Sequence, residues 1–468
     1  MSHADHSLTI RAAIRAEIGA LGRVVAAIGD ADGQVGGVDI VAGAGSAGEV
    51  VRDITVMVAD PVHAERIRDA VEALECATVL QSEDRVFRAH HGGKMGMRTS
   101  VVVNGRDDLA MAYTPGVARV CMAIHEDFER AWDYTIKGSS VMVVSDGSSV
   151  VGQGDLGPLA ALPALEAKAA FLKTRAGIDA FPLPVTVREP SEIADVVARC
   201  ASVFAGIHLS DIAAPRCFEV QRLLAERLDI PVFHDDQQGT AAVILAGLTN
   251  GLAVSGKELG DATVVLAGLG PGGLAVARLL LAAGVGDLIA CDSAGAVTAD
   301  RTDLTHDERD LAARSNREGR TGAARDLVAG ADAFIGLSAP ELLTAADVAT
   351  MAADPVVFAL ATPHPEVRGD QAAGARVYAT GRPDVPNQIN SSLASPGIWR
   401  GALDCRATTI NDEMTLAAAS AIAATAMEEA GGLSELNVVP SFFNDALVPN
   451  VAAAVRAAAE ATGVARTS

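Results

Sequence analysis

The sequence is poor in aromatic residues, in cysteines and in positive charges, and each shortage excludes a class of protein. Only 3% of the 468 residues are aromatic although half are hydrophobic, so alanine, valine, leucine and isoleucine must fill the core. The 37 lysines and arginines stand against 59 aspartates and glutamates, and the net charge of -22 would repel a nucleic-acid backbone. The six cysteines form no C-x-x-C pair, which favours reduced thiols over disulfides or a zinc site.

Long apolar runs are also missing. The most apolar region is interrupted by Arg278 and Asp287, so no stretch has the length of a membrane-spanning helix. The N-terminus carries charges where a secretion signal needs an apolar centre. We therefore expect a soluble, cytoplasmic protein with no membrane partner. The adjacent His90 and His91 lie in a glycine-rich linker with no second pair at ligand spacing, which favours solvated side chains over a metal site.

What is present is a nucleotide-binding pattern over residues 262–292. An apolar strand at 263–267 is followed by Gly268, Gly270 and Gly273, then by a helical pattern and a second strand that ends in Asp292. In such a unit the first glycine permits a tight turn, the second lets the backbone approach a pyrophosphate, and the third packs helix on strand. Asp292 would bond the ribose hydroxyls and disfavour a 2′-phosphate. The pattern predicts a Rossmann-type domain that binds NAD rather than NADP.

Residues 1–90 read as a separate unit with the order βαββαβ, a split sheet with two helices. The predicted strands and helices alternate along the chain: strand 8–18, helix around 24–28, strands 35–41 and 50–58, helix 61–74, and a strand from 78. The stretch EIGALGRVVAAIGDADGQVGGVDIV resembles an ACT domain. That resemblance implies self-pairing and a small regulator, often an amino acid, near the Gly-Leu turn; an oligomerisation module without a ligand is equally compatible with the pattern.

The rest of the chain alternates strands and helices, and we expect an α/β fold with two further domains, 91–250 and 251–468. Ser191 is a plausible N-cap of a helix. Polar residues follow the buried strands, where a doubly wound sheet builds its cofactor crevice, and Ser338 and Asn387 are predicted cofactor contacts there. The apolar strands are predicted at 142–145, 232–234, 331–337, 356–360 and 376–379, and the alanine-rich C-terminal region is predicted to be helical.

A series of motifs joins these elements and carries a clear resemblance. Three of them place a lysine or an acid among apolar residues, where burial is costly unless the group is paired or bound to metal. The motifs, in order, are YTPGVA, VSDGSSVVGQGDLGPLAALP, DAFPL, DIAAPRCFEV, IPVFHDDQQGTA, FALATPHPEV and PNQINSSLASPGIWRGALD. From about residue 95 to 460 the chain resembles a malic enzyme of the short bacterial type.

The resemblance implies an NAD-linked oxidative decarboxylation of L-malate to pyruvate, assisted by Mg²⁺ or Mn²⁺. It makes Lys168 the base for the C2 hydroxyl, Tyr113 the acid that protonates C3, and Asp235 the acid beside the lysine. Asp211 and Asp236 would hold the metal. A neutral Lys168 would need a pKa lowered by burial and a nearby metal. The resemblance also implies a homodimer or a larger homo-oligomer, in which a tyrosine or lysine of the site can come from a neighbouring subunit.

The substrate side departs from the family pattern at several positions. Ser210 stands where the family has a metal-binding glutamate, Thr362 and Ser391 stand where it has asparagines, and Asn390 matches a substrate-side asparagine. Ser149 stands where long-form relatives carry an arginine for a substrate carboxylate. Three readings therefore remain open: a malic enzyme with a weaker metal site, the same reaction on another 2-hydroxy-3-carboxy acid, or a non-catalytic NAD-binding regulator.

Overall fold

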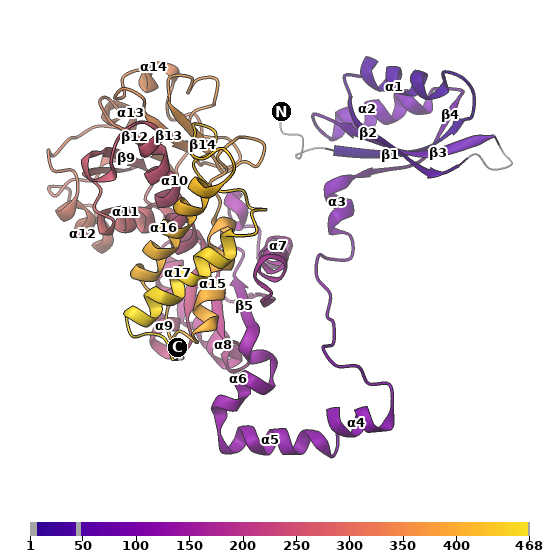
Figure 1. Cartoon of the computed structure of the whole chain (residues 1–468). Coiled ribbons are helices and arrows are strands. Elements are labelled where there is room, and N and C mark those ends of the chain that lie inside the picture. Colours follow the sequence, from indigo (N-terminus) through magenta and orange to yellow (C-terminus); the bar gives the residue numbers. More distant parts are fainter. Residues whose placement is uncertain (1–6, 44–47, 467–468) are drawn as a thin grey trace. The chain divides into compact units, whose positions relative to one another are not determined.

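The computed structural model describes residues 7–43 and 48–466, which fall into two compact units, Met1–Gly96 and Met97–Ser468 (Figure 1). The first unit corresponds to the separate N-terminal module expected from the sequence. The second unit contains two parallel sheets and a set of C-terminal helices. The predicted division of this region into domains 91–250 and 251–468 stays a prediction, because its residues cluster as one unit.

The N-terminal unit is a four-stranded antiparallel sheet with the strand order β2-β3-β1-β4, and its two longer helices cover one face (Figure 1). Ile10 and Ile54 of the sheet pack in one core with Val24, Ile28 and Ile67 of the helices. The βαββαβ order predicted from the sequence is confirmed. The elements are β1 (Ser7–Arg15), α1 (Ala20–Asp30), β2 (Gln34–Ala42), β3 (Glu49–Met57), α2 (Pro61–Glu72), β4 (Ala77–Asp84) and α3 (Arg85–His90).

The first sheet of the second unit is parallel and buried, with the order β6-β5-β7-β8. Its strands are β5 (Ser140–Ser145), β6 (Asp179–Pro184), β7 (Gly206–Leu209) and β8 (Val232–His234), and its helices are α7 (Pro158–Ala176), α8 (Pro190–Cys200) and α9 (Arg216–Arg227). The predicted N-cap at Ser191 is wrong. Helix α8 already begins at Pro190, whose fixed φ suits the first helical position, so Glu189 is the flanking residue.

The second sheet has the order β11-β10-β9-β12-β13-β14 and is parallel except at β11. Because the chain leaves central strand β9 first toward β10 and later returns to β12, a topological switch point lies between β9 and β12. The expected Rossmann-type architecture is confirmed. The strands are β9 (Thr263–Ala267), β10 (Asp287–Asp292), β11 (Gly295–Ala296), β12 (Ala333–Gly336), β13 (Val356–Ala359) and β14 (Val377–Thr380).

Helices join the two sheets into one body. Helix α10 (Thr240–Val254) is buried along almost its whole length and packs against α11 (Pro271–Ala282) and α16 (Asp412–Glu428). Helix α15 (Ser395–Asp404) packs against α17 (Leu447–Ala461) and α7. One continuous apolar core therefore includes residues of both sheets. The short helices α12 (His306–Arg314), α13 (Ala324–Leu327) and α14 (Ala345–Val348) complete the Rossmann half.

A helical arm precedes the first sheet. It consists of α4 (Arg106–Ala112) and α5 (Gly116–Glu126), neither of which has a buried residue, and α6 (Ala131–Tyr134) follows. Figure 1 shows α4 and α5 projecting away from the sheets of their own unit. Trp132 of α6 is buried in the main core and anchors the arm. Within residues 7–43 and 48–466, the structure contains no helix with the length and apolarity needed to cross a bilayer.

Candidate functional site

The carboxyl ends of β5, β7 and β8 meet at one edge of the first sheet and place polar side chains together. Asp211 follows β7, and Asp235 and Asp236 follow β8. Lys168 reaches this edge from α7, and Ser391 reaches it from a short helical turn, η7 (Ser391–Leu393). Five residues singled out in the sequence thus lie in one cluster, although they come from four separate segments of the chain.

Lys168, Asp235 and Ser391 form the centre of this cluster. The Lys168 ammonium and the Ser391 hydroxyl both donate to Oδ2 of Asp235, the latter over 2.8 Å, and the Asp235 side chain is 2% exposed. Burial favours a neutral lysine, but the charges of Asp235, Asp236 and Asp211 outweigh it and raise the pKa of Lys168. The lowered pKa expected from the sequence requires a bound metal as well as burial, and it stays a prediction.

Asp211, Asp236 and Ser210 form the acidic side of the cluster. The Asp211 backbone N–H donates to Asp236 Oδ2 over 3.0 Å, and Asp211 has a left-handed φ of 57°, a strained conformation typical of functional sites. Burial, followed by the charge of Asp236, raises the pKa of Asp211 to about 6. Asp211 Oδ2 and the Ser210 hydroxyl oxygen are both buried and have no hydrogen-bond partner.

These oxygen atoms fit a hard divalent cation. Two carboxylates and a hydroxyl are the ligand types that Mg²⁺ and Mn²⁺ accept, and Mg²⁺ retains several waters when the protein supplies few ligands. The protein's own ligand set is small, since no group of three or more His, Cys, Asp or Glu suited to a metal occurs among the described residues. The predicted metal-binding role of Asp211 and Asp236 stays a prediction, and the orphaned oxygens support it.

Two buried histidines back the acidic cluster, and sequence reasoning assigned neither of them a role. The His208 ring accepts a hydrogen bond at Nδ1 from Trp399 Nε1 over 2.9 Å, and its Nε2 lies 3.8 Å from Asp235 Oδ1. Nδ1 of His234 lies 3.8 Å from Asp236 Oδ2, and neither of its ring nitrogens has a hydrogen-bond partner. Burial lowers the pKa of both histidines, that of His208 to about 4.

The glycine fingerprint sits between β9 and α11 with the geometry expected for it. Gly268 has φ +98°, and a Cβ there would lie 2.3 Å from the Leu337 carbonyl oxygen. A Cβ on Gly273 would lie 1.8 Å from the Gly268 carbonyl oxygen, so only glycine allows the helix to approach its own turn. A Cβ on Gly270 would meet nothing within 4 Å, which leaves its backbone open to a ligand at the start of α11.

Asp292 ends β10 as predicted, but an arginine already holds its carboxylate. Arg301 donates to both oxygens, from Nη1 over 2.9 Å and from Nη2 over 2.7 Å, and the Ala294 N–H donates as well. Partial burial raises the pKa of Asp292, but these hydrogen bonds outweigh it and hold the pKa below its usual value. Nothing in the sequence pattern pointed to Arg301, because the turn at β11 determines that its side chain points toward Asp292.

Glu366 ties together the ends of two Rossmann strands. Its oxygens accept from the Ser338 N–H over 2.9 Å and from the Ala361 N–H over 3.0 Å, and the residue is fully buried. Thr362, which follows Ala361, is exposed. A Cβ on Gly152 would contact it at 3.6 Å, so the glycine-rich loop after β5 lies beside this strand end. The crevice side of the Rossmann sheet therefore faces the first sheet's loop.

Three predicted site residues have other surroundings. The Asn387 amide donates to the carbonyls of Tyr378 and Glu435 and accepts from the Val438 N–H, so its side chain is engaged with the backbone. Asn390 is exposed, and its side chain caps η7 through the Ser392 N–H. Tyr113 ends α4 on the arm and is 66% exposed, and within one chain it does not join the lysine cluster. The roles predicted for these residues remain untested.

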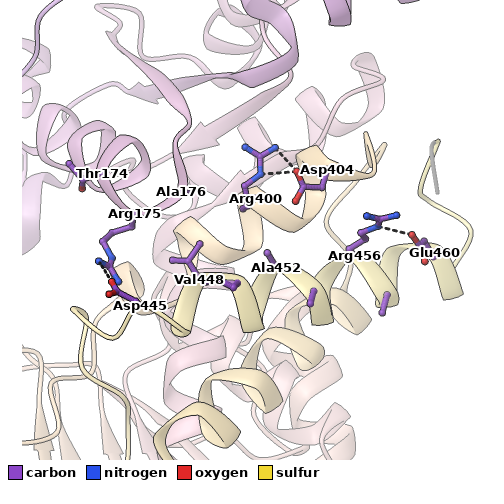
Figure 2. Close-up of a pocket in the computed structure, with 13 residues that line it drawn as sticks. Thr174, Arg175, Ala176, Arg400, Asp404, Asp445, Val448, Ala452, Arg456 and Glu460 are labelled. Carbon is purple, nitrogen blue, oxygen red and sulfur yellow. Dashed lines mark hydrogen bonds and ion pairs between the residues drawn. The ribbon is translucent and has the colours of Figure 1, made fainter. Parts of the chain in front are cut away.

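A large groove lies elsewhere in the second unit. This groove, of about 780 Å³, runs between the C-terminal end of α7 and helices α15 and α17, and none of the predicted site residues lines it. Figure 2 shows its three arginines, Arg175, Arg400 and Arg456, each directed at a carboxylate: Asp445, Asp404 and Glu460. Because every one of these cations already has a partner, the groove offers no free charge to a ligand.

Comparison with known proteins agrees with this arrangement. The family described as "Malic enzyme, N-terminal domain" matches residues 93–193, and "Malic enzyme, NAD binding domain" matches residues 237–460. The NAD-dependent malic enzyme of Geobacillus stearothermophilus is 47% identical over 461 residues, 98% of this chain and 96% of that protein. The bifunctional malic/malolactic enzyme of Bacillus subtilis is 46% identical over 377 residues, 80% of this chain and 92% of its own length.

Solved structures give the same result. The malic enzyme of Pyrococcus horikoshii superposes with a TM-score of 0.77 at 43% identity and covers 80% of this chain and 89% of its own. The Entamoeba histolytica malic enzyme superposes with a TM-score of 0.79 at 34% identity, over 82% of each chain. The matched families, the full-length Geobacillus relative and the superpositions agree with the clustered Lys168 and aspartates: the chain belongs to the malic enzyme family.

Proposed function

We propose that this chain catalyses the metal-dependent oxidative decarboxylation of L-malate to pyruvate and CO₂, with reduction of NAD. The observation that carries the proposal is the buried Lys168–Asp235 pair beside Asp211 and Asp236. Once deprotonated, an amine can take a proton from a hydroxyl, and the carboxylates beside it can bind a divalent cation. The full-length similarity to an NAD-dependent malic enzyme supports the same reaction.

In this proposal Lys168 removes the proton of the C2 hydroxyl while the C2 hydride passes to the nicotinamide. The C3–C4 bond of the resulting 2-keto acid then breaks, CO₂ leaves, and the electrons of that bond form the enolate of pyruvate. Tyr113 protonates C3 of this enolate to complete the reaction. Mg²⁺ or Mn²⁺, held by Asp211 and Asp236 with Ser210 nearby, would polarise the C2 oxygen and offset part of the negative charge that holds Lys168 protonated.

Asp235 and Ser391 position Lys168 and influence its protonation in this proposal. Ser391 donates to the same Asp235 oxygen as Lys168, so the two donors share one oxygen atom. A hydrogen bond from Ser391 stabilises the carboxylate independently of the lysine, and it weakens the hold of Asp235 on the ammonium. On the cofactor side, we assign the pyrophosphate to the α11 N-terminus with Gly268, Gly270 and Gly273, and the ribose to Asp292. Ser338 and Asn387 would complete the cofactor crevice, and Asn390 and Thr362 the substrate side.

We further propose that Tyr113 acts in the site of a second subunit of a homo-oligomer. Its arm has no buried residue in α4 or α5 and exposes Leu109, Met111 and Met122. Such an exposed apolar surface is unfavourable in water and needs a partner surface. A second copy of the chain supplies one by symmetry, and the Lys168 cluster of one chain lacks a tyrosine of its own.

The N-terminal unit is proposed to be an ACT-like regulatory or pairing module. Its split βαββαβ sheet and the left-handed Gly19 at the start of α1 agree with that assignment, and an amino acid near this turn is the proposed regulator. A cytoplasmic location suits the six cysteines, all of which are free thiols.

One assay tests the main proposal. Purified protein with NAD, Mn²⁺ and L-malate should form NADH and pyruvate in equal amounts, and Lys168→Ala should abolish both. A panel of 2-hydroxy-3-carboxy acids run in parallel tests the alternative substrate suggested by Ser210, Thr362 and Ser391. A better substrate than malate in that panel would replace malate in the proposal. NAD binding without turnover of any of these acids would favour a non-catalytic NAD-binding regulator instead.

A further inference from the structure

A row of four neighbouring side chains, Trp399, His208, Asp235 and Lys168, runs from α15 to α7, with hydrogen bonds at its two ends and a 3.8 Å gap between His208 and Asp235. Trp399 lies in α15 and His208 lies in β7, and both are almost completely buried. The ring of Phe233 in β8 lies against both, with centroids 5.4 Å from His208 and 5.9 Å from Trp399. These contacts hold the imidazole plane in place, with Nδ1 toward Trp399 and Nε2 toward Asp235.

Trp399 determines which nitrogen of His208 carries the proton. The indole N–H is a donor only, so Nδ1, 2.9 Å away, must accept. In a neutral imidazole the single ring proton then has to be on Nε2. The ring is almost completely buried, and burial favours the neutral imidazole over the charged one. His208 is thereby fixed as the Nε2–H tautomer.

The Nε2–H faces the one oxygen of Asp235 that nothing else occupies. Oδ2 accepts from Lys168 and Ser391, whereas Oδ1 and His208 Nε2 are both buried without a hydrogen-bond partner. The two atoms lie 3.8 Å apart, a separation that a small rotation of either side chain closes to hydrogen-bond length. A Cβ on Gly239 would lie 3.0 Å from Oδ1, so the glycine leaves room for the Asp235 carboxylate.

We propose that His208 is a positioning residue that acts through Asp235, and that Trp399 fixes it in the donating tautomer. The Nε2–H anchors Oδ1 and fixes the rotation of the carboxylate, so that Oδ2 is presented to Lys168. The orientation of the Lys168 amine toward a bound 2-hydroxy acid then depends on a side chain that never touches the substrate. This inference rests on the role proposed above for Lys168.

The test is a set of substitutions that separate a donor from a packing group. His208→Leu fills the space but removes the donor, whereas the amide N–H of His208→Gln reaches close to the position of Nε2. We expect His208→Leu to lower kcat about 10- to 100-fold with little change in the KM for NAD, a size typical of lost outer hydrogen bonds at such sites. His208→Gln should keep kcat within about 3-fold of the parent chain, because its donor is retained.

Trp399→Phe removes the indole N–H and keeps an aromatic ring, so it tests the tautomer directly. In the parent chain it should lower kcat several-fold because Nδ1–H imidazoles become populated. In the His208→Gln background it should lower kcat no further, since an amide has no tautomer to fix. Tyr378→Phe, which likewise removes an aromatic hydrogen-bond donor and keeps the ring but lies in the Rossmann half, is the matched control. Thermal unfolding and NADH fluorescence show that each variant is folded and binds cofactor.

The possible results are distinct. Equal losses in His208→Leu and His208→Gln, or additive losses in the double variant, indicate packing alone and overturn the proposal. Full activity in folded His208→Leu overturns it too. Lys168→Ala, assayed alongside, separates the two proposals: an active Lys168→Ala removes the proposed function of the lysine and this inference with it. An inactive Lys168→Ala with a fully active His208→Leu removes only the inference.

Discussion

At the scale of single residues, we expect Ser210 to limit how tightly the proposed metal site holds a cation. Its hydroxyl is buried without a partner beside Asp211, in the place where a carboxylate would add a negative charge. We expect Ser210→Glu to tighten Mn²⁺ binding about 10- to 100-fold and to leave L-malate the preferred substrate. Calorimetric titration of the cofactor-free protein with Mn²⁺ measures the change. Ser82→Glu, which adds the same charge in the N-terminal unit, should leave the affinity unchanged; an equal gain there would mean a general charge effect.

Arg301 should weaken the preference for NAD over NADP that was predicted for Asp292. Its guanidinium neutralises the carboxylate and would attract a 2′-phosphate. Arg301→Gln should therefore lower kcat/KM for NADP about tenfold while changing that for NAD only a few-fold, equivalent to losing roughly 1.4 kcal/mol of phosphate attraction. The control is Arg278→Gln, an arginine of α11 that pairs with Asp307. An unchanged NAD/NADP ratio in Arg301→Gln would show that the arginine serves only the local fold.

Acidification should destabilise the fold through His208. Its folded pKa, about 4, is below the ordinary value of 6.5, so between these values the unfolded chain binds more protons. The free energy of unfolding therefore falls as pH drops from about 6.5 to about 4, by roughly 3 kcal/mol. The charges that face the ring are Asp235 and Asp236, which raise its pKa, and Lys168 and His234, which lower it. Thermal midpoints of the parent and His208→Gln between pH 7 and 4.5 measure this contribution, and parallel curves would contradict it.

Sequence motifs identify residues at strand ends better than the residues that support them. Lys168 and Asp235 could be predicted because a charged residue inside an apolar motif must find a partner. His208, Arg301 and Glu366 could not, because their partners lie 191, 9 and 28 residues away and a strand or turn aims each side chain. Tyr113 shows the opposite case: its motif was recognised, yet its side chain is mostly exposed and lies on the arm rather than in the described lysine cluster.

At the scale of elements, Glu366 fixes the separation of β12 and β13 at the cofactor crevice. Each of its oxygens accepts one backbone N–H, so Glu366→Gln would turn an amide N–H toward a donor. We expect a loss of about 1–3 kcal/mol in the free energy of unfolding, together with a higher KM for NAD. Denaturant unfolding and steady-state kinetics give the two values. Glu341→Gln, at an exposed glutamate beside the same strand ends, should change neither value. A normal KM for NAD in Glu366→Gln would show that the cofactor crevice keeps its shape without the two hydrogen bonds that Glu366 accepts.

Most elements could be predicted from periodicity because their burial is one-sided or complete. Strands β12 and β13 of the Rossmann sheet contain only apolar residues and a glycine, and the predicted 356–360 corresponds to β13 within a residue. The predicted ends of strands are less accurate where a turn follows the strand. Strand β1 ends at Arg15 instead of continuing to residue 18, because the chain already turns toward the left-handed Gly19, and Ile18 is fully exposed.

At the scale of the whole molecule, the unpaired helical arm predicts a site shared between chains. Neither α4 nor α5 buries a residue, and no local pattern in the sequence distinguishes a helix that packs on its own chain from one that packs on another. If Tyr113 serves the partner's Lys168, then Tyr113→Phe and Lys168→Ala variants will complement each other. In a mixed dimer one site would contain both intact residues and the other site would contain both substitutions.

Co-refolding equal amounts of the two variants should therefore restore about a quarter of the parent activity, since half of the dimers are mixed and each has one intact site. Each variant refolded with itself should stay inactive. A mixture of Lys168→Ala with Asp235→Asn is the matched control, because both residues lie in the same cluster and no mixed dimer would contain an intact site. If the Tyr113 mixture also stays inactive while mixed dimers are shown to form by mass spectrometry, Tyr113 acts within its own chain, and the arm must fold back on the unit that carries it.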